Sequence, residues 1–114
     1  MQLIYKIVPE ELWRHSEANG VFEGAPVDLA DGYIHFSTAV QVRETAGKHF
    51  KGQNGLLLAA FETQAFGDKL KWEPSRGGDL FPHLYATFAP SEARWVQPLP
   101  LDDSGHHVFP DLEQ

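Results

Sequence analysis

The sequence has no cysteine, which excludes disulfide bonds, thiolate metal ligands and a cysteine nucleophile. Basic residues are also few: nine lysines and arginines stand against sixteen acidic residues, for a net charge of −7. Proteins that bind long DNA or RNA use a basic surface to neutralise phosphates, and the sequence has no basic cluster. The composition therefore argues against extended nucleic-acid binding, whereas a small anion needs only a few cations.

Long hydrophobic runs are absent as well. No segment approaches the roughly 20 apolar residues that cross a bilayer, and the apolar run before Pro9 is too short for a signal peptide. We therefore expect a cytoplasmic protein without a membrane partner. A length of 114 residues and 42% hydrophobic residues predict one domain over residues 1–114, with a core at about 2–100 and a polar tail at about 102–114.

Alternating strand and helix signals run along the first third of the chain. Residues 3–8 have the apolar, β-branched composition of a strand, and Pro9 with two following glutamates is typical of a helix start. That helix is expected to end near Asn19-Gly20. Glycine and proline breakers predict a loop at residues 21–32, followed by a strand over residues 31–37.

A second helix and several strands are predicted after this point. Thr38 and Gln41 have the spacing of a capping box, and Val42, Ala46 and Phe50 mark the buried stripe of the helix that follows. The continuous apolar run at 55–61 predicts a central strand, the segment 74–82 a loop, and further strands are expected at 69–73, 83–88 and 93–96. This order predicts an α+β fold, a mostly antiparallel sheet with two helices packed on it.

The strand at 31–37 carries the first candidate site residues. Side chains alternate along a strand, so Tyr33, His35 and Ser37 share one face, and Ile34 and Phe36 share the other. The second face has the composition of a core, whereas the first offers hydrogen-bonding groups. We interpret the polar face as one wall of a cleft.

Two more segments could contribute to the same cleft. His83 and Tyr85 share a face of a later strand, and imidazole and hydroxyl groups on adjacent strands can bind a ribose or phosphate or transfer protons. Lys6 lies within an apolar strand, where it would line a polar cavity, form an ion pair or remain exposed at a sheet edge. The last possibility is as consistent with the pattern as the other two.

The segment 71–78 offers further candidates. Lys71 and Glu73 share a strand face, and Trp72 is expected to point into the core. Arg76 precedes two glycines, so its guanidinium and the backbone amides could hold an anion, although a solvated arginine on an exposed loop is the commoner arrangement. Whether Lys71 or Glu73 faces the cleft stays open. The six histidines lack metal-ligand spacing, and we predict no metal site.

Four segments, in order and spacing, resemble the signature segments of the bacterial family designated domain of unknown function 952: Tyr5-Lys6-Ile7, residues 31–37, Lys71-Trp72-Glu73 and residues 81–85. This family is in turn similar, more distantly, to the ADP-ribosyltransferase fold and its RNA 2′-phosphotransferases. Those enzymes use NAD and carry a strand of the form V-H-L-S, which the segment 34–37 resembles.

The resemblance implies an ADP-ribosyltransferase-like fold and NAD as a cofactor. In such a site His35 and Ser37 would face a nicotinamide–ribose pocket, with Lys6 on the neighbouring strand. Glu73 and Ser37 would then stabilise a ribosyl cation electrostatically, and His35 would hydrogen-bond the ribose hydroxyls. The catalytic candidates are therefore His35, Glu73 and Ser37, and the ligand-binding candidates are Lys6, Tyr33, Lys71, Arg76, His83 and Tyr85.

Three interpretations remain open at this stage. The cleft could serve a small enzyme that acts on a nucleotide-like or other small anionic ligand. It could instead belong to a non-catalytic module that binds a small molecule or a peptide. In the third, Lys6, His35, Glu73 and His83 form a buried polar network with only a structural role.

Overall fold

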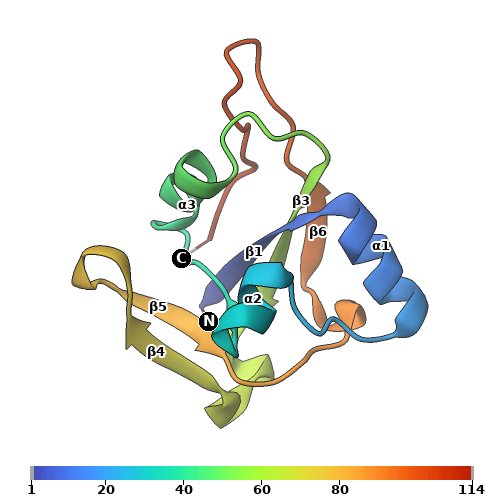
Figure 1. Ribbon diagram of the computed structural model, residues 1–114, viewed down its shortest axis with the longest axis vertical. Helices are drawn as coiled ribbons and strands as arrows, with labels where there is room; N and C mark the ends of the chain where they lie inside the picture. The colour runs from blue at the N-terminus through green and yellow to red at the C-terminus, as the bar shows by residue number, and fades with distance from the viewer. Residues whose placement is uncertain (1, 114) are drawn as a thin grey trace.

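The computed structural model describes residues 2–113, which fold as two three-stranded antiparallel sheets and three α-helices (Figure 1). The strand order is β1-β3-β6 in the first sheet and β2-β5-β4 in the second. The strands are β1 (Leu3–Pro9), β2 (Ile34–His35), β3 (Leu56–Glu62), β4 (Leu70–Pro74), β5 (Leu80–Leu84) and β6 (Trp95–Pro98). The helices are α1 (Glu10–Asn19), α2 (Pro26–Asp31) and α3 (Val42–His49), and short 3₁₀ turns occupy Thr63–Ala65, Gly67–Lys69, Arg76–Gly78 and Pro90–Glu92.

The first sheet is buried on both faces, which explains the apolar run in its central strand. One face of β3 presents Leu57, Ala59 and Phe61 to a core that also contains Trp13 of α1 and Leu84 of β5. This core packs the two sheets together and holds a cluster of aromatic rings. The expected central strand at 55–61 is confirmed, because β3 lies between β1 and β6.

The other face of the first sheet forms a second core under α3. Val42 and Ala46 of the helix pack there against Leu58 of β3, as their spacing predicted. Phe109 and Leu112 from the polar tail also pack against this core. The last described residues therefore fold back over the first sheet, and the Tyr5 hydroxyl donates to the backbone oxygen of Glu113 at 2.7 Å.

A short backbone bridge joins the two sheets. Tyr5 N donates to Ser37 O at 2.8 Å, and Ser37 N donates back to Tyr5 O at 2.9 Å. Because this bridge sits beside Lys6 on one side and just after His35 on the other, it brings β1 alongside the end of β2. The positions of Lys6 and His35 are thus fixed by backbone pairing.

Several expectations about the elements were wrong. The structure has two sheets where one was expected, and α2 lies inside the segment predicted as a loop at 21–32. Strand β5 begins at Leu80, inside the loop predicted at 74–82, and ends at Leu84. Proline is compatible with this strand because the Pro82 carbonyl still accepts from Phe36 N at 3.0 Å.

Two further corrections concern single residues. Trp72 does not point into the core: it is 38% exposed, because the core face of β4 ends at Leu70 and Trp72 lies beyond it on an edge strand. Thr38 and Gln41 exchange the expected side-chain bonds, at 3.2 and 3.0 Å, but they do so in the turn before α3, which begins at Val42. Within the described chain, no helix is both long and apolar enough to cross a membrane.

Candidate functional site

One face of the second sheet carries nearly all the predicted site residues. His35 pairs with His83, and His83 pairs with Lys71, so the three side chains share a face, since residues opposite one another in a sheet point the same way. The opposite face carries Ile34, which belongs to the core. The strand itself is shorter than the one predicted at 31–37, because β2 is only Ile34–His35 and Asp31 ends α2, but the predicted division of faces is confirmed for Ile34 and His35.

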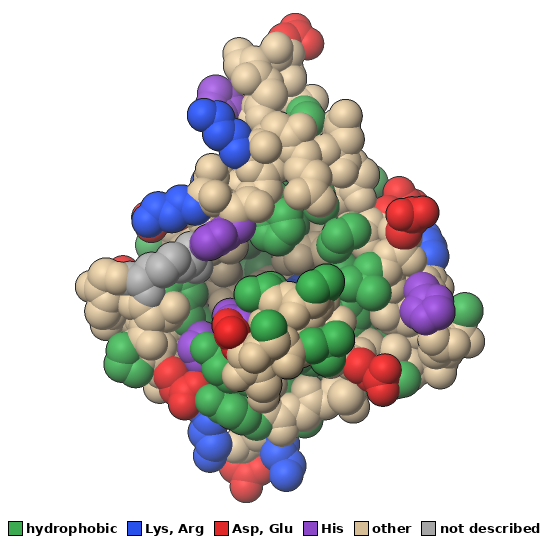
Figure 2. Space-filling model, viewed as in Figure 1, with side chains coloured by type: hydrophobic (Ala, Val, Ile, Leu, Met, Phe, Trp, Pro, Cys, Tyr) green, Lys and Arg blue, Asp and Glu red, His purple; other side chains and the backbone are tan. Residues whose placement is uncertain are grey.

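A cavity of about 500 Å³ lies over part of this polar face. Its wall includes side chains from β1, α2, β2, α3 and β5, and Figure 2 shows this side of the molecule hollowed near its centre, with hydrophobic and histidine side chains around the hollow. The polar lining residues include Lys6, Asp31, His35, Ser37, Thr45 and His83; the apolar ones include Ile7, Val27, Phe36, Phe50 and Phe81. The volume falls within the range of small-molecule sites.

Lys6, which lines the cavity, forms a buried ion pair with Asp28, which does not. Lys6 Nζ lies 3.1 and 2.9 Å from the two carboxylate oxygens of Asp28, and the residues are 6% and 2% exposed. Asp28 also accepts from Ala25 N at 2.8 Å and from His35 N at 3.0 Å. The alternative of an exposed edge lysine is therefore wrong, because Asp28 neutralises Lys6 inside the fold.

The titration of this pair reflects competition between burial and charge. Burial raises the pKa of Asp28, but the His35 hydrogen bond, the Lys6 charge and two backbone amides outweigh it and lower the pKa from 3.8 to about 2. Burial also lowers the pKa of Lys6, against the opposing effect of Asp28. Asp28 is therefore the fixed negative charge around which this part of the site is arranged.

Helix α2 determines the position of Asp28. The sequence analysis predicted neither this helix nor a role for Asp28. Pro26 occupies the first helical position, and the Asp28 carboxylate caps the start of the helix by accepting from Ala25 N. Gly24 has φ +129°, and a Cβ there would meet Asp28 Cβ at 3.0 Å, so the approach to the helix favours glycine. The proline, the aspartate two positions later and Gly32 at the end were the signals available in the sequence.

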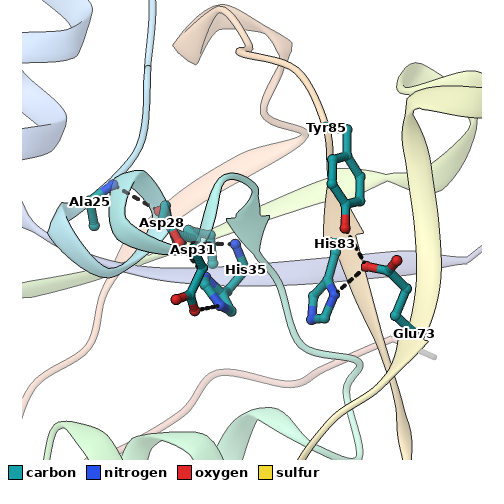
Figure 3. A network of polar contacts seen from close by, with 8 residues as sticks. Ala25, Asp28, Asp31, His35, Glu73, His83 and Tyr85 are labelled. Carbon is teal, nitrogen blue, oxygen red and sulfur yellow. Dashed lines mark hydrogen bonds and ion pairs between the residues drawn. The ribbon is translucent and has the colours of Figure 1, made fainter.

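His35 is held by two carboxylates at once. Its Nδ1 lies 2.7 Å from Asp28 Oδ1, and its Nε2 lies 3.0 Å from Asp31 Oδ2 at the end of α2 (Figure 3). The His35 side chain is 29% exposed, and Asp31 is 47% exposed, so the Asp31 contact lies at the cavity mouth. The ring is therefore fixed from both sides.

His83 has a single carboxylate partner. Its Nδ1 lies 2.8 Å from Glu73 Oε1, and the Tyr85 hydroxyl donates to the same oxygen at 2.8 Å (Figure 3). The hydrogen bonds from His83 and Tyr85 lower the pKa of Glu73, and the bond to Glu73 raises the pKa of Tyr85. Glu73 thus bonds to the polar side chains of this face, while Lys71 is exposed, and neither of the two lines the cavity.

Tyr33 connects the two histidine clusters. Its ring stacks on His83 with centroids 4.1 Å apart and an interplanar angle of 27°, and it lies 4.6 Å from the His35 ring. Burial, followed by the charges of Asp31 and Glu73, raises the pKa of Tyr33. The predicted residues Tyr33, His35, His83, Glu73 and Tyr85 are therefore assembled into one polar layer.

Ser37 and Glu73 do not make the contacts that were expected of them, and the side chain of Arg76 is not described. Ser37 lines the cavity, but its Oγ lies 3.0 Å from Thr45 Oγ1, and no bond from His35 to Ser37 occurs among the described residues. Glu73 reaches the cavity only through His83. The side chain of Arg76 lies outside the described residues, so its expected contact with an anion stays a prediction.

With this geometry in hand, the chain can be compared with known proteins. The model of the family described as "Protein of unknown function (DUF952)" matches residues 7–96. The chain belongs to the DUF952 family. The family expected from the four sequence segments is therefore confirmed.

Solved structures of a second protein share the DUF952 fold found here. The crystal structure of protein CC0527 from Caulobacter crescentus matches with a TM-score of 0.89 at 49% identity, over 93% of each chain. The solution NMR structure of CC0527 matches with a TM-score of 0.84 at 50% identity, over 93% of this chain and 91% of the other. The comparison with curated proteins gave no match.

Proposed function

We propose that this DUF952 protein binds a small organic molecule in the cavity beside His35 and His83. The observation that carries the proposal is a cavity of about 500 Å³ lined by both histidines of the polar layer. A pocket of this size with an apolar wall and a few convergent polar groups is the usual form of a small-molecule site.

The lining chemistry suits a flat or apolar group joined to hydroxyls. Phe36, Phe50 and Phe81 supply apolar surface, while His35, Ser37 and Thr45 supply hydrogen-bonding groups. A nucleoside has both parts, a planar base and a ribose. The similarity of the 34–37 segment to the V-H-L-S strand of NAD-using transferases supports the nicotinamide–ribose part of NAD as a specific member of this class.

Charge limits where a phosphate would lie. Lys6 is neutralised by Asp28, and Asp31 and Glu73 add negative charge around the histidines. The inner part of the cavity therefore favours a neutral or cationic group over an anion. In a nucleotide ligand, the base and ribose would occupy the cavity, and the phosphates would point towards its mouth.

The second candidate function is the binding of NAD without its cleavage. Glu73, the expected catalytic carboxylate, has both His83 and Tyr85 on one oxygen and does not line the cavity. A carboxylate in this position orients His83 more directly than it stabilises a ribosyl cation. NAD cleavage would need another group, whereas binding needs none.

Calorimetric titration with NAD, ADP-ribose, AMP and nicotinamide tests the proposal. We expect saturable binding of at least one compound, weakened tenfold or more in the His35→Ala and Phe81→Ala variants. Lys71→Ala is the matched control, because Lys71 shares the sheet face but is exposed, and it should bind as the parent does. The absence of binding at millimolar concentration for all four compounds would refute the nucleoside class.

A further inference from the structure

The two histidines of the site differ in their hydrogen bonding. Both ring nitrogens of His35 face carboxylate oxygens, Asp28 Oδ1 at 2.7 Å and Asp31 Oδ2 at 3.0 Å. An ionised carboxylate only accepts hydrogen bonds, so both contacts form together only when both ring nitrogens carry hydrogen. The geometry around His35 therefore suits a ring that carries a hydrogen on each nitrogen.

His83 has the opposite arrangement. Glu73 accepts from one nitrogen only, Nδ1, at 2.8 Å, and no described residue bonds to Nε2. Figure 3 shows this second nitrogen on the side of the ring away from Glu73. Because the bond to Glu73 fixes the hydrogen on Nδ1, the lone pair of a neutral His83 is on Nε2. His83 lines the cavity, so a ligand can reach this lone pair.

The surroundings keep this difference in place. His35 and His83 are direct cross-strand partners with ring centroids 5.5 Å apart, and Tyr33 packs against both rings. A cation beside His83 disfavours a second positive charge there. The charged or titratable groups around the pair are Lys6, Asp28, Asp31, His49, Lys71, Glu73, Tyr33 and Tyr85.

From this arrangement we propose that the cavity is a general-base site for hydroxyl compounds, in which His83 accepts the proton and a His35 imidazolium beside it keeps His83 in the neutral, proton-accepting form. In this step the O–H bond of a ligand or water breaks, an N–H bond forms at His83 Nε2, and the electron pair stays on oxygen. As the proton moves, the same oxygen bonds to an electrophilic carbon of the substrate; the leaving group departs with its bonding pair and takes up the proton from His83. The proposal rests on the cavity being the ligand site.

The ionisation pattern is tested first, without ligand, by nitrogen NMR of the imidazole rings at neutral pH. We expect both nitrogens of His35 in the N–H range, and for His83 a protonated Nδ1 with an unprotonated Nε2. Exposed His15 and His106 serve as internal references. In Asp31→Ala the fraction of His35 with an unprotonated Nε2 should rise. An unprotonated nitrogen on parent His35, or a hydrogen on His83 Nε2, would overturn the proposal.

Proton acceptance is tested with 4-nitrophenyl acetate as the electrophile and water as the hydroxyl. We expect hydrolysis above background to fall tenfold or more in His83→Gln, since general-base catalysis typically contributes a factor of about 10² or more. Lys51→Ala, a change at an exposed lysine outside the cavity lining, should retain the rate. Equal rates in His83→Gln and the parent would overturn the proposal.

A second variant guards against misfolding of His83→Gln, because His83 is buried. Glu73→Ala removes only the partly exposed carboxylate; it should lower the rate and give a mixture of His83 tautomers while the fold persists by circular dichroism. A retained single tautomer in this variant would contradict the role given to Glu73. If the NMR pattern and hydrolysis are as expected but no nucleoside binds, only the nucleoside class is refuted.

Discussion

The two sheets of the molecule use the same backbone pattern for different purposes. In β1-β3-β6 both faces of the central strand are buried, one in each core. In β2-β5-β4 one face is buried, and the other carries two histidines that line the cavity, together with two tyrosines and a glutamate. The first sheet is therefore buried on both sides, whereas the second has a polar face, where the proposed site lies.

The difference also explains where charge is tolerated. Lys6 belongs to the first sheet but points towards the second, and its burial depends on Asp28 from α2. The ion pair thus lies where the first sheet meets the second. Substitutions that change stability and ligand binding separately test the comparison of the two sheets most directly.

The largest effect is expected for Asp28→Ala. This change leaves Lys6 buried without a partner and removes the cap of α2 and the anchor of His35. We expect a loss of about 4 kcal/mol in the free energy of unfolding, measured by urea denaturation. The double variant Lys6→Met with Asp28→Asn should recover part of the loss, and failure to do so would show that the ion pair is not the cause.

Leu58→Ala probes the first sheet without touching the site. Leu58 is completely buried in the second core, so its truncation should cost about 3 kcal/mol. Ligand affinity measured below the unfolding transition should stay nearly unchanged, because Leu58 itself does not line the cavity. A large loss of affinity in this variant would break the division between the two sheets.

Low pH should lower the free energy of unfolding, because Asp28 becomes protonated. A carboxyl group whose pKa is lower in the folded than in the unfolded chain stabilises the fold above its unfolded value and loses that contribution as the pH falls. With a pKa of about 2 against an ordinary 3.8, Asp28 should account for about 2 kcal/mol lost as the pH falls through this range. Urea denaturation across this range measures the loss.

An exposed aspartate provides the control for this acid effect. Asp102 also has a lowered pKa, because the backbone amides of His106 and Ser104 donate to it, but it lies on the surface. Asp102→Asn should leave the acid loss nearly unchanged, whereas the Lys6→Met/Asp28→Asn variant should reduce it. Equal acid loss in both variants would assign the effect to other carboxylates.

The smallest stability effect is expected for His35→Ala. The His35 side chain is 29% exposed. When it is removed, Asp28 still pairs with Lys6 and accepts hydrogen bonds from two backbone amides, so we expect the free energy of unfolding to fall by only about 1 kcal/mol. Ligand binding should fall at the same time. A cost of several kcal/mol with unchanged binding would favour the purely structural network.

The sequence predicted the strand pattern that positions the site better than it predicted the site's charges. Alternation along residues 31–37 and 81–85 was enough to place His35 and His83 on polar faces, because strand side chains alternate regardless of context. Asp28 was missed because α2 has only six residues, too few to show helical periodicity.

The surroundings of Trp72 and Glu73 depend on the tertiary fold and do not follow from local sequence pattern. Alternation separated their faces correctly, but how far the core extends along β4 depends on packing between distant segments, and Trp72 lies beyond its end. Likewise, the capture of Glu73 by His83 and Tyr85 depends on the register of β4 with β5. Register is a tertiary property that local pattern does not fix.

The most direct test of the division between the sheets is a map of backbone amide shifts during titration with the four nucleoside-related compounds. We predict saturable shifts confined to residues 5–7, 26–37, 45–50 and 75–85, with β3 and β6 unperturbed, and loss of these shifts in His35→Ala. Shifts centred on β6 or α1 instead would contradict the account, because they would place the ligand site outside the polar face of the second sheet.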